Sequence, residues 1–287
     1  MALGHDDLVL CGGTLQATPL LDRLEPARAA GFAGISMFAT DLEAVTATGM
    51  TVRDVRERIA DAGLQVAEFD CVGKWLGRQE PKGGMPGWLA ELLMRSTPDY
   101  ICALAAEVGA RSVTVIEMFG IDFDADDMAE SFAAVCDTAA AHGLRAHLEF
   151  LPVGGIRSLA QGWEVVRRAD RPNGGLHVDA WHLFRSGSRL SDLASVPGEK
   201  VYCVQLCDGP EHPAADPTSE LMRGRLMPGE GAFDLTGFVR AIDAIGCAAP
   251  WSVEVFSDSH AGQLPAEVAR RAAEATRRVI QQAREGI

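Results

Sequence analysis

The sequence predicts an α/β protein whose 287 residues form one (β/α)8 barrel. Short apolar runs alternate with longer amphipathic runs along the whole chain, which is the pattern of a parallel sheet wrapped by helices. With 47% hydrophobic residues the chain can fill one large core, so residues 1–287 are expected to form a single domain. An open doubly wound sheet is the alternative fold, but no GxGxxG motif follows the first expected strand.

Eight strands are expected to alternate with seven helices. The strands are residues 8–11, 34–37, 65–69, 112–116, 145–149, 175–179, 201–206 and 251–255. The helices are residues 20–30, 52–62, 88–108, 128–142, 160–168, 235–245 and 266–284. Five of the helices are followed by a glycine where a C-cap is expected, namely Gly31, Gly63, Gly109, Gly143 and Gly246. Between the sixth and seventh strands, the segment 190–194 is short and weakly patterned.

Charge and composition argue against several classes of partner. The net charge is −14, from 40 acidic and 26 basic residues, and no Lys/Arg run stands out, so nucleic acid and anionic membranes are not expected partners. The apolar runs are too short to span a membrane, and the first residues lack the features of a signal peptide. Seven dispersed cysteines without a CxxC motif are typical of reduced, mostly buried thiols, so a cytoplasmic protein is expected.

Two long connections follow the third and seventh strands. The first, 71–86, carries Lys74, Trp75, Arg78 and Lys82, and the second, 207–233, carries Asp208, His212, Arg223, Arg225 and Glu230. Both start at the carboxyl end of a strand, where barrel enzymes place their active sites. Because loops of this length are more often functional than idle, we expect them to border the site.

The last four strands each end on an oxygen-donor side chain: Glu149, Asp179, Gln205 and Glu254. Side chains alternate in direction along a strand, so each of the four is expected to be the last inward residue of its strand. Three buried carboxylates need compensation, which a divalent cation or a salt-bridge network can supply. We favour the metal, and this all-oxygen donor set predicts Mn²⁺ or Mg²⁺, with Co²⁺ as a further option, over Zn²⁺.

The same residues resemble a known superfamily. The strings LEF at 148–150, VDAWHLFR at 178–185, VQLCDG at 204–209, RLMPGEG at 225–231 and VEV at 253–255 are similar to those of sugar phosphate isomerases and epimerases, the xylose isomerase-like TIM barrels. The resemblance implies one divalent ion held by Glu149, Asp179, Gln205 and Glu254. Many epimerases of this group have His at the strand-seven position, and the Gln here resembles the 3-dehydroshikimate dehydratase branch. The abasic-site endonuclease branch is disfavoured, because the chain has seven histidines in all and is acidic.

The resemblance also implies roles for residues around the metal. Glu149 and Glu254 are expected to be catalytic, together with His182, whose alternative is a structural histidine in the core. Arg225 is expected near the polar end of the substrate, with a solvated loop position as the alternative. Weaker expectations of substrate contact concern Trp181, Arg185 and Lys74.

Three functions are weighed on this basis. The first is an isomerase or epimerase that acts on a keto-sugar, cyclitol or other small polyhydroxylated substrate through proton abstraction next to a carbonyl and an enediolate intermediate. The second is a dehydratase of the 3-dehydroshikimate dehydratase kind, which Gln205 favours. The third, a ligand-binding barrel without activity, has no need of metal-bound carboxylates. A homo-oligomer is left open by the sequence.

Overall fold

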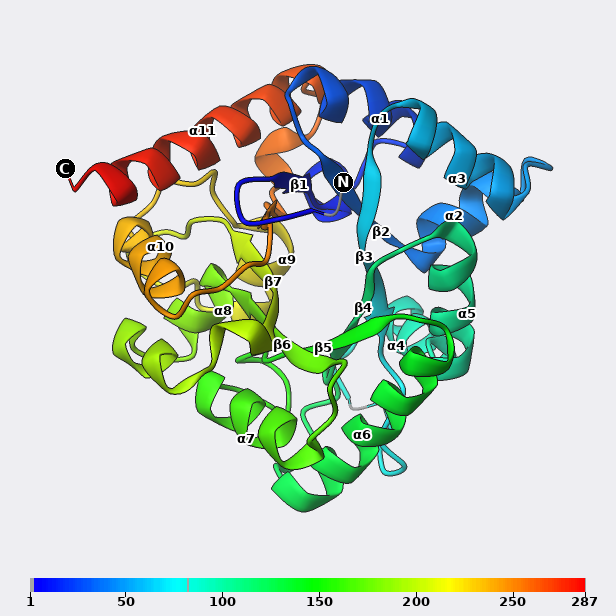
Figure 1. Ribbon diagram of the computed structural model, residues 1–287, viewed down its shortest axis with the longest axis vertical. Helices are drawn as coiled ribbons and strands as arrows, with labels where there is room; N and C mark the ends of the chain where they lie inside the picture. Colours follow the sequence, from blue (N-terminus) through cyan, green and yellow to red (C-terminus); the bar gives the residue numbers. More distant parts are fainter. Residues whose placement is uncertain (1–2, 82, 287) are drawn as a thin grey trace.

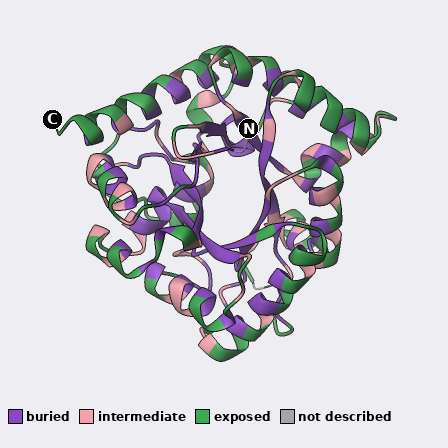
Figure 2. Cartoon of the chain, in the orientation of Figure 1, coloured by how far each residue is buried: buried purple, intermediate pink, exposed green. Residues whose placement is uncertain are grey.

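The chain folds into a closed barrel of eight parallel strands that follow one another in sequence order (Figure 1). The computed structural model describes residues 3–81 and 83–286. Strand β1 pairs with β2 on one side and with β8 on the other, which closes the sheet. The helices form a ring outside the strands, and Figure 2 shows buried strands within helices whose outer faces are exposed. The predicted (β/α)8 fold is thereby confirmed.

All eight predicted strands are present in the described residues, with small differences at their ends. They are β1 (Leu8–Leu10), β2 (Gly34–Phe38), β3 (Gln65–Val72), β4 (Ser112–Ile116), β5 (Arg145–Glu149), β6 (Gly174–Asp179), β7 (Val201–Leu206) and β8 (Trp251–Val253). The largest difference is at β3, which continues to Val72 where an end at Phe69 was expected.

The helices include elements that the sequence did not predict. They are α1 (Leu20–Ala29), α2 (Ala39–Thr46), α3 (Val52–Asp61), α4 (Gly87–Arg95), α5 (Pro98–Val108), α6 (Ala125–Ala141), α7 (Leu159–Ala169), α8 (Ala180–Arg185), α9 (Pro217–Arg223), α10 (Leu235–Ala244) and α11 (Pro265–Glu285). Short 3₁₀ turns are η1 (Gly12–Leu15), η2 (Leu190–Ser195), η3 (Gly198–Lys200) and η4 (Asp258–His260). The five glycines expected at helix ends all have φ between 70° and 82°, a conformation that glycine adopts without strain.

One predicted helix is wrong: residues 88–108 form two helices, α4 and α5, and not one. The break lies at Ser96 and Thr97, where the Thr97 hydroxyl accepts a hydrogen bond from the Tyr100 backbone N–H. Pro98 then occupies the first turn of α5, where its missing N–H costs nothing. The consequence is an extra helix, α4, outside the regular alternation of strands and helices.

The second long connection is closed at its base by Asp208. The carboxylate of Asp208 accepts hydrogen bonds from the backbone N–H groups of Gly209 (2.8 Å), Gly229 (3.0 Å) and Phe233 (3.0 Å). Its backbone also pairs with that of Leu226 in an isolated antiparallel bridge. The loop between these points contains α9 and is tied to the end of β7 on both sides.

Two further findings bear on the predicted class of protein. All seven cysteines are free, and six of them are buried, as predicted for the thiols. Among residues 3–81 and 83–286, none of the helices combines the length and the apolar character that crossing a membrane requires.

Candidate active site and metal centre

The four predicted metal ligands lie together at the carboxyl ends of neighbouring strands. Glu149 ends β5, Asp179 ends β6, Gln205 is the penultimate residue of β7, and Glu254 directly follows β8. In the sheet Asp179 pairs with Gln205, and Gln205 pairs with Ser252, which precedes Glu254 by two residues. All four ligand side chains are buried. The alternation rule therefore placed them correctly on the inner face.

In one orientation the Gln205 amide oxygen faces only acceptor atoms and its nitrogen faces only donors. Its oxygen lies 2.9 Å from Asp179 Oδ2, 3.1 Å from Glu254 Oε2 and 3.0 Å from His177 Nε2. An amide oxygen gains nothing from ionised carboxylate oxygens unless a cation lies among them. The alternative is an amide turned over, with its nitrogen donating to the same three atoms. The first orientation suits a metal-loaded centre and the second a metal-free one.

Glu149 has an oxygen without a hydrogen-bond partner in this buried position. Its Oε1 lies 3.2 Å from His182 Nε2 and 3.7 Å from His177 Nε2, but forms no hydrogen bond to either. Burial raises the pKa of Glu149, and the two histidines outweigh that effect and lower it to about 2. The two histidines thus favour the ionised carboxylate, which is the form that binds a cation. Its Oε1, which has no hydrogen bond, is the oxygen free to do so.

Two donor sets for a cation overlap here. The ligand atoms of Glu149, Asp179 and His182 lie within 4.8 Å of one another, which makes a compact set with one nitrogen. The set predicted from the sequence replaces His182 with Gln205 and Glu254. We favour the all-oxygen set, because the Gln205 amide lies 2.9 Å from Asp179 Oδ2 and 3.1 Å from Glu254 Oε2, so these side chains meet at one point.

Arg225 is held by two of the predicted ligands. Its Nη1 donates to Asp179 Oδ2 at 2.7 Å and to Glu254 Oε2 at 3.0 Å, and the guanidinium lies over the rings of Trp181 and Phe256. Burial lowers the pKa of Arg225, but the adjacent carboxylates raise it well above its usual value. With His177 and His182 neutral, one fixed positive charge among three carboxylates leaves two negative charges. A divalent cation would neutralise them.

Asp179 and His182 are positioned by the start of α8. Asp179 caps this helix, because its Oδ1 accepts from the backbone N–H groups of Trp181 (2.5 Å) and His182 (3.2 Å). Its other oxygen is therefore left to face the centre of the barrel. His182 lies in the first turn of α8, directly after the sixth strand, and is buried; a loop does not carry it.

A cavity of about 290 Å³ opens over these residues. Glu149, His182, Arg225 and Glu254 line it, as does His177. The cavity is near the lower end of the range of about 300–1,000 Å³ for small-molecule sites. It therefore brings together the three predicted catalytic residues and one predicted substrate-binding residue.

Two acids from β3 belong to the same region and were missed. Asp70 lines the cavity and is bonded to the Thr114 hydroxyl, and Glu68 lies deeper in the barrel. Burial is the main cause that raises the pKa of Asp70 to about 8 and that of Glu68 to about 7. Asp70 was missed because the strand was predicted to end at Phe69. It could have been found, because a polar side chain at the end of a buried strand is the signal that predicted the four ligands.

Cys11 is a further partner that the sequence did not suggest. Its thiol donates to Glu254 Oε1 at 2.9 Å and receives the Ser36 hydroxyl at 3.2 Å. Burial raises the pKa of Glu254 and also raises that of Cys11 well above its usual value. The thiol therefore stays protonated and orients one oxygen of Glu254.

Three predicted substrate-binding residues do not line the cavity. Trp181 Nε1 and Arg185 Nε both donate to Glu220 Oε1 of α9, at 3.0 Å and 2.6 Å. The Lys74 ammonium donates to three backbone carbonyl groups of its own loop, the nearest at 2.7 Å. These contacts organise the loops around the site. Lys82, which the sequence placed in the same loop as Lys74, lies outside the described residues.

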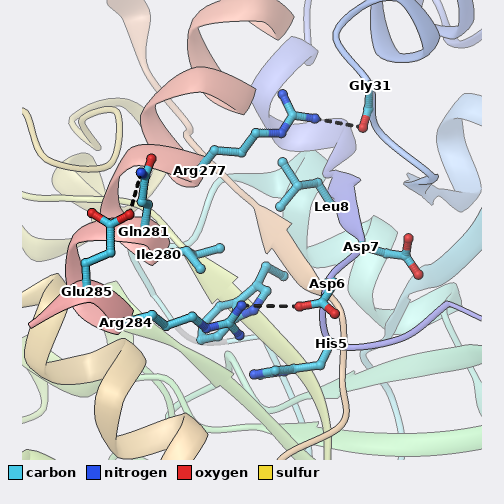
Figure 3. A pocket seen from close by; sticks show the side chains of 11 residues that line it. His5, Asp6, Asp7, Leu8, Gly31, Arg277, Ile280, Gln281, Arg284 and Glu285 are labelled. Atoms are coloured by element: carbon cyan, nitrogen blue, oxygen red, sulfur yellow. Dashed lines mark hydrogen bonds and ion pairs between the residues drawn. The ribbon is translucent and has the colours of Figure 1, made fainter.

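A larger hollow of about 440 Å³ lies at the opposite end of the barrel, beside the first residues of β1 and β8 (Figure 3). Its charged groups already have partners: Arg284 contacts Asp6 at 3.2 Å, and Arg277 donates to the carbonyl of Gly31 at 2.9 Å. Barrel enzymes place their chemistry at the carboxyl ends of the strands, so we assign no reaction to this hollow.

The sequence matches the xylose isomerase-like TIM barrel family over residues 24–279. The chain belongs to this family. A 3-dehydroshikimate dehydratase of Pseudomonas aeruginosa is 33% identical over 242 residues, which cover 83% of this chain and 36% of that enzyme. An inosose isomerase of Bacillus subtilis is 32% identical over 142 residues, covering 49% of this chain and 50% of that enzyme.

Among solved structures, a fusion of a xylose isomerase-like TIM barrel with a 4-hydroxyphenylpyruvate dioxygenase superposes with a TM-score of 0.84 and 26% identity. The match covers 98% of this chain and 44% of the fusion protein. The chain thus spans about a third of the length of the curated dehydratase that it matches.

Proposed function

We propose that this protein is a divalent-metal-dependent enzyme that removes a proton next to a substrate carbonyl and then eliminates water. The observation that carries the proposal is the group of three buried carboxylates at strand ends: Glu149 and Asp179 offer oxygens within 4.8 Å of each other, and Asp179 and Glu254 share the Nη1 of Arg225. A lyase is favoured over an isomerase because similarity to a 3-dehydroshikimate dehydratase extends over 83% of the chain.

Glu149, Asp179, Gln205 and Glu254 would hold the ion. When bound, it supplies Lewis acidity that polarises a carbonyl or hydroxyl oxygen. Oxygen donors favour Mn²⁺ or Mg²⁺, with Co²⁺ next.

Residues on two sides of the cavity are placed to carry out the two proton transfers. Glu149 and His182 lie together, with 3.2 Å between Oε1 and Nε2, while Glu254 approaches from β8. In the proposed reaction, a carboxylate on one side takes the proton from the carbon next to the carbonyl. His182 gives a proton to the departing hydroxyl oxygen, so that water leaves and a conjugated ketone remains.

Isomerisation or epimerisation is the second candidate. It shares the first proton abstraction and differs in where a proton returns. The similarity to an inosose isomerase over 49% of the chain favours it.

The test uses metal-loaded protein and a panel of hydroxy ketones in D₂O. A new conjugated absorbance indicates elimination, and deuterium uptake without it indicates isomerisation or epimerisation. Glu254→Ala should lose the ion, and His182→Ala should keep it and lose about 10²–10⁴-fold in kcat/KM. His142→Ala, at an exposed position, is the matched control. Neither signal with any ketone, or no metal after Mn²⁺ loading, would overturn the proposal.

A further inference from the structure

We infer that Trp181 and Glu220 are positioning residues for His182. The Glu220 carboxylate holds the Trp181 indole, and the indole holds the imidazole in the orientation that proton transfer needs. This inference rests on the proposed function, since it takes His182 as the group that protonates the departing oxygen. Neither Trp181 nor Glu220 lines the cavity, so both would act through His182 and not on the substrate.

The imidazole of His182 lacks a hydrogen bond that commonly orients a histidine in proton transfer. Such a histidine is usually fixed through its second ring nitrogen, which bonds to a carbonyl or carboxylate group. In His182, Nε2 faces Glu149 Oε1 at 3.2 Å, and Nδ1 is buried without a hydrogen-bond partner among residues 3–81 and 83–286. One contact does not fix a ring, so its orientation must also come from packing.

The Trp181 indole provides that packing. Its ring lies edge-on to the imidazole of His182, with 5.3 Å between the ring centroids and 90° between the ring planes. This T-shaped arrangement is one of the favourable geometries of two aromatic rings. Both residues lie in α8 and each is 1% exposed, so neither ring can turn without displacing its surroundings. The position of the indole therefore determines that of the imidazole.

Glu220 fixes the indole in turn. Its Oε1 accepts from Trp181 Nε1 at 3.0 Å and from Arg185 Nε at 2.6 Å, and its Oε2 accepts from the Ala214 backbone N–H at 2.6 Å. Hydrogen bonds to an ionised carboxylate are among the stronger ones in proteins. Glu220 is buried, so these bonds are shielded from water. The carboxylate thus ties α8 to α9 and sets the angle of the indole.

Arg225 contacts the same indole but does not depend on it. Its guanidinium lies 5.5 Å from the centre of the Trp181 ring. Arg225 is also held by ion pairs with Asp179 and Glu254. Releasing the indole should therefore displace His182 and leave the proposed metal ligands in place.

The first test reads the imidazole directly, without a substrate. An aromatic ring shifts the NMR signals of protons on a neighbouring ring by an amount that depends on the distance and angle between the two rings. In the presence of Mg²⁺, the ring-proton signals of His182 are identified by their absence from His182→Ala. Glu220→Ala should shift them, while Glu211→Ala, at an exposed position of the same connection, should not. Unmoved His182 signals in Glu220→Ala would overturn the inference.

The second test reads the turnover of a hydroxy ketone that the parent converts. Glu220→Ala should lower kcat by on the order of 10²-fold, as expected when a reacting group is displaced by about 1 Å. KM and the Mn²⁺ affinity should remain near those of the parent. A loss that falls on KM or on the Mn²⁺ affinity, with kcat unchanged, would contradict the positioning of His182.

Trp181→Phe keeps an aromatic ring and removes the N–H that Glu220 accepts. It should lower kcat in the same way but less, and it provides the same test if Glu220→Ala does not fold. Because the two residues act in series, adding Trp181→Phe to Glu220→Ala should cause little further loss. Losses that multiply in the double variant would show independent effects and would overturn the inference.

The two tests separate this inference from the proposed function. If the His182 signals move in Glu220→Ala and the parent converts no ketone, the proposed function fails and the positioning of His182 stands. If the parent converts a ketone and Glu220→Ala keeps the parent's kcat, the inference fails alone.

Discussion

In the proposed metal centre, Gln205 occupies the position where many epimerases of the resembling group are expected to have an imidazole. Both side chains are neutral, so a change between them leaves the charge of the ligand set unaltered. The difference lies in the donor atom, since an amide oxygen is a harder ligand than an imidazole nitrogen. The identity of this one residue should therefore set which divalent ion is preferred.

Gln205→His should raise the affinity for Zn²⁺ relative to Mn²⁺, because zinc gains more from a nitrogen donor. Competition titrations of the two ions against the purified variant would measure the ratio. Gln16→His, which adds an imidazole elsewhere in the cavity lining, is the control and should leave the ratio unchanged. An unaltered ratio in Gln205→His would place Gln205 outside the coordination sphere.

The sequence predicted the residues of the proposed metal centre and missed their neighbours for a physical reason. Glu149 and Asp179 could be predicted because a polar side chain at the end of a buried strand has one place to point. The bond from Cys11 to Glu254 depends on the pairing of β1 with β8, which joins the two ends of the chain. The double ion pair of Arg225 depends on the path of a long loop, which local patterns do not determine.

At the scale of elements, Glu117 joins the segments that follow β4 and β5. One of its oxygens accepts from the Phe119 backbone N–H at 2.8 Å. The other accepts from Gly120 at 3.0 Å and from Gly155 at 2.5 Å. The close approach leaves no room for a side chain at Gly155, where a Cβ would lie 2.5 Å from the Glu117 carboxylate. Glu117 therefore connects the two loops through backbone hydrogen bonds.

Glu117→Gln should lower the free energy of unfolding by about 2–3 kcal/mol. The amide nitrogen of Gln would replace an oxygen that now accepts a backbone N–H, which breaks at least one bond to a charged group. Denaturant unfolding measures the loss, and Glu107→Gln on an exposed face of α5 is the control. Bound Mn²⁺ should be the same in both variants, because Glu117 does not line the cavity. A variant as stable as the parent would show that these bonds contribute no net stability.

The elements themselves were predicted unevenly. Strands and long helices have a regular spacing of apolar residues, so the presence of each of them could be predicted. The break before Pro98 has a clear signal in Thr97, but the apolar pattern runs across it and hides it. Helix α9 has seven residues, which are too few to establish a hydrophobic period. The part of the cavity lining that α9 provides could therefore not be predicted from the sequence.

At the scale of the whole molecule, several carboxyl groups are buried in the interior. Burial raises the pKa of Asp70 to about 8 and that of Glu68 to about 7, while His177 partly offsets the effect in both. A raised pKa means that the folded protein keeps a proton which the unfolded chain releases above about pH 4. The stabilisation from Asp70 is thus full below about pH 4 and is lost as the pH rises to about 8.

The metal-free protein should therefore become less stable between pH 4 and pH 8, and Asp70→Asn should be less sensitive to pH across that range. Denaturant midpoints at several pH values would measure both slopes. The self-repulsion of a chain with net charge −14 affects parent and variant almost alike, so the difference between them isolates Asp70. Parallel profiles for the two proteins would show that Asp70 does not keep its proton in the folded state.

The hydrogen bonds of Asp208 hold the loop after β7 in place at its base, so the sequence of the loop can change without disturbing the barrel. Gly209 and Phe233 are joined through one carboxylate oxygen, so the chain leaves and re-enters the barrel at nearly the same point. Within this loop, residues 210–223 lie between the points bonded to Asp208 at Gly209 and Leu226, so the length and sequence of that stretch are not part of the closure. New ligand selectivity can thus arise by changes in α9 and its flanks that keep Glu220, while the strand-end ligands and the hydrophobic core stay as they are.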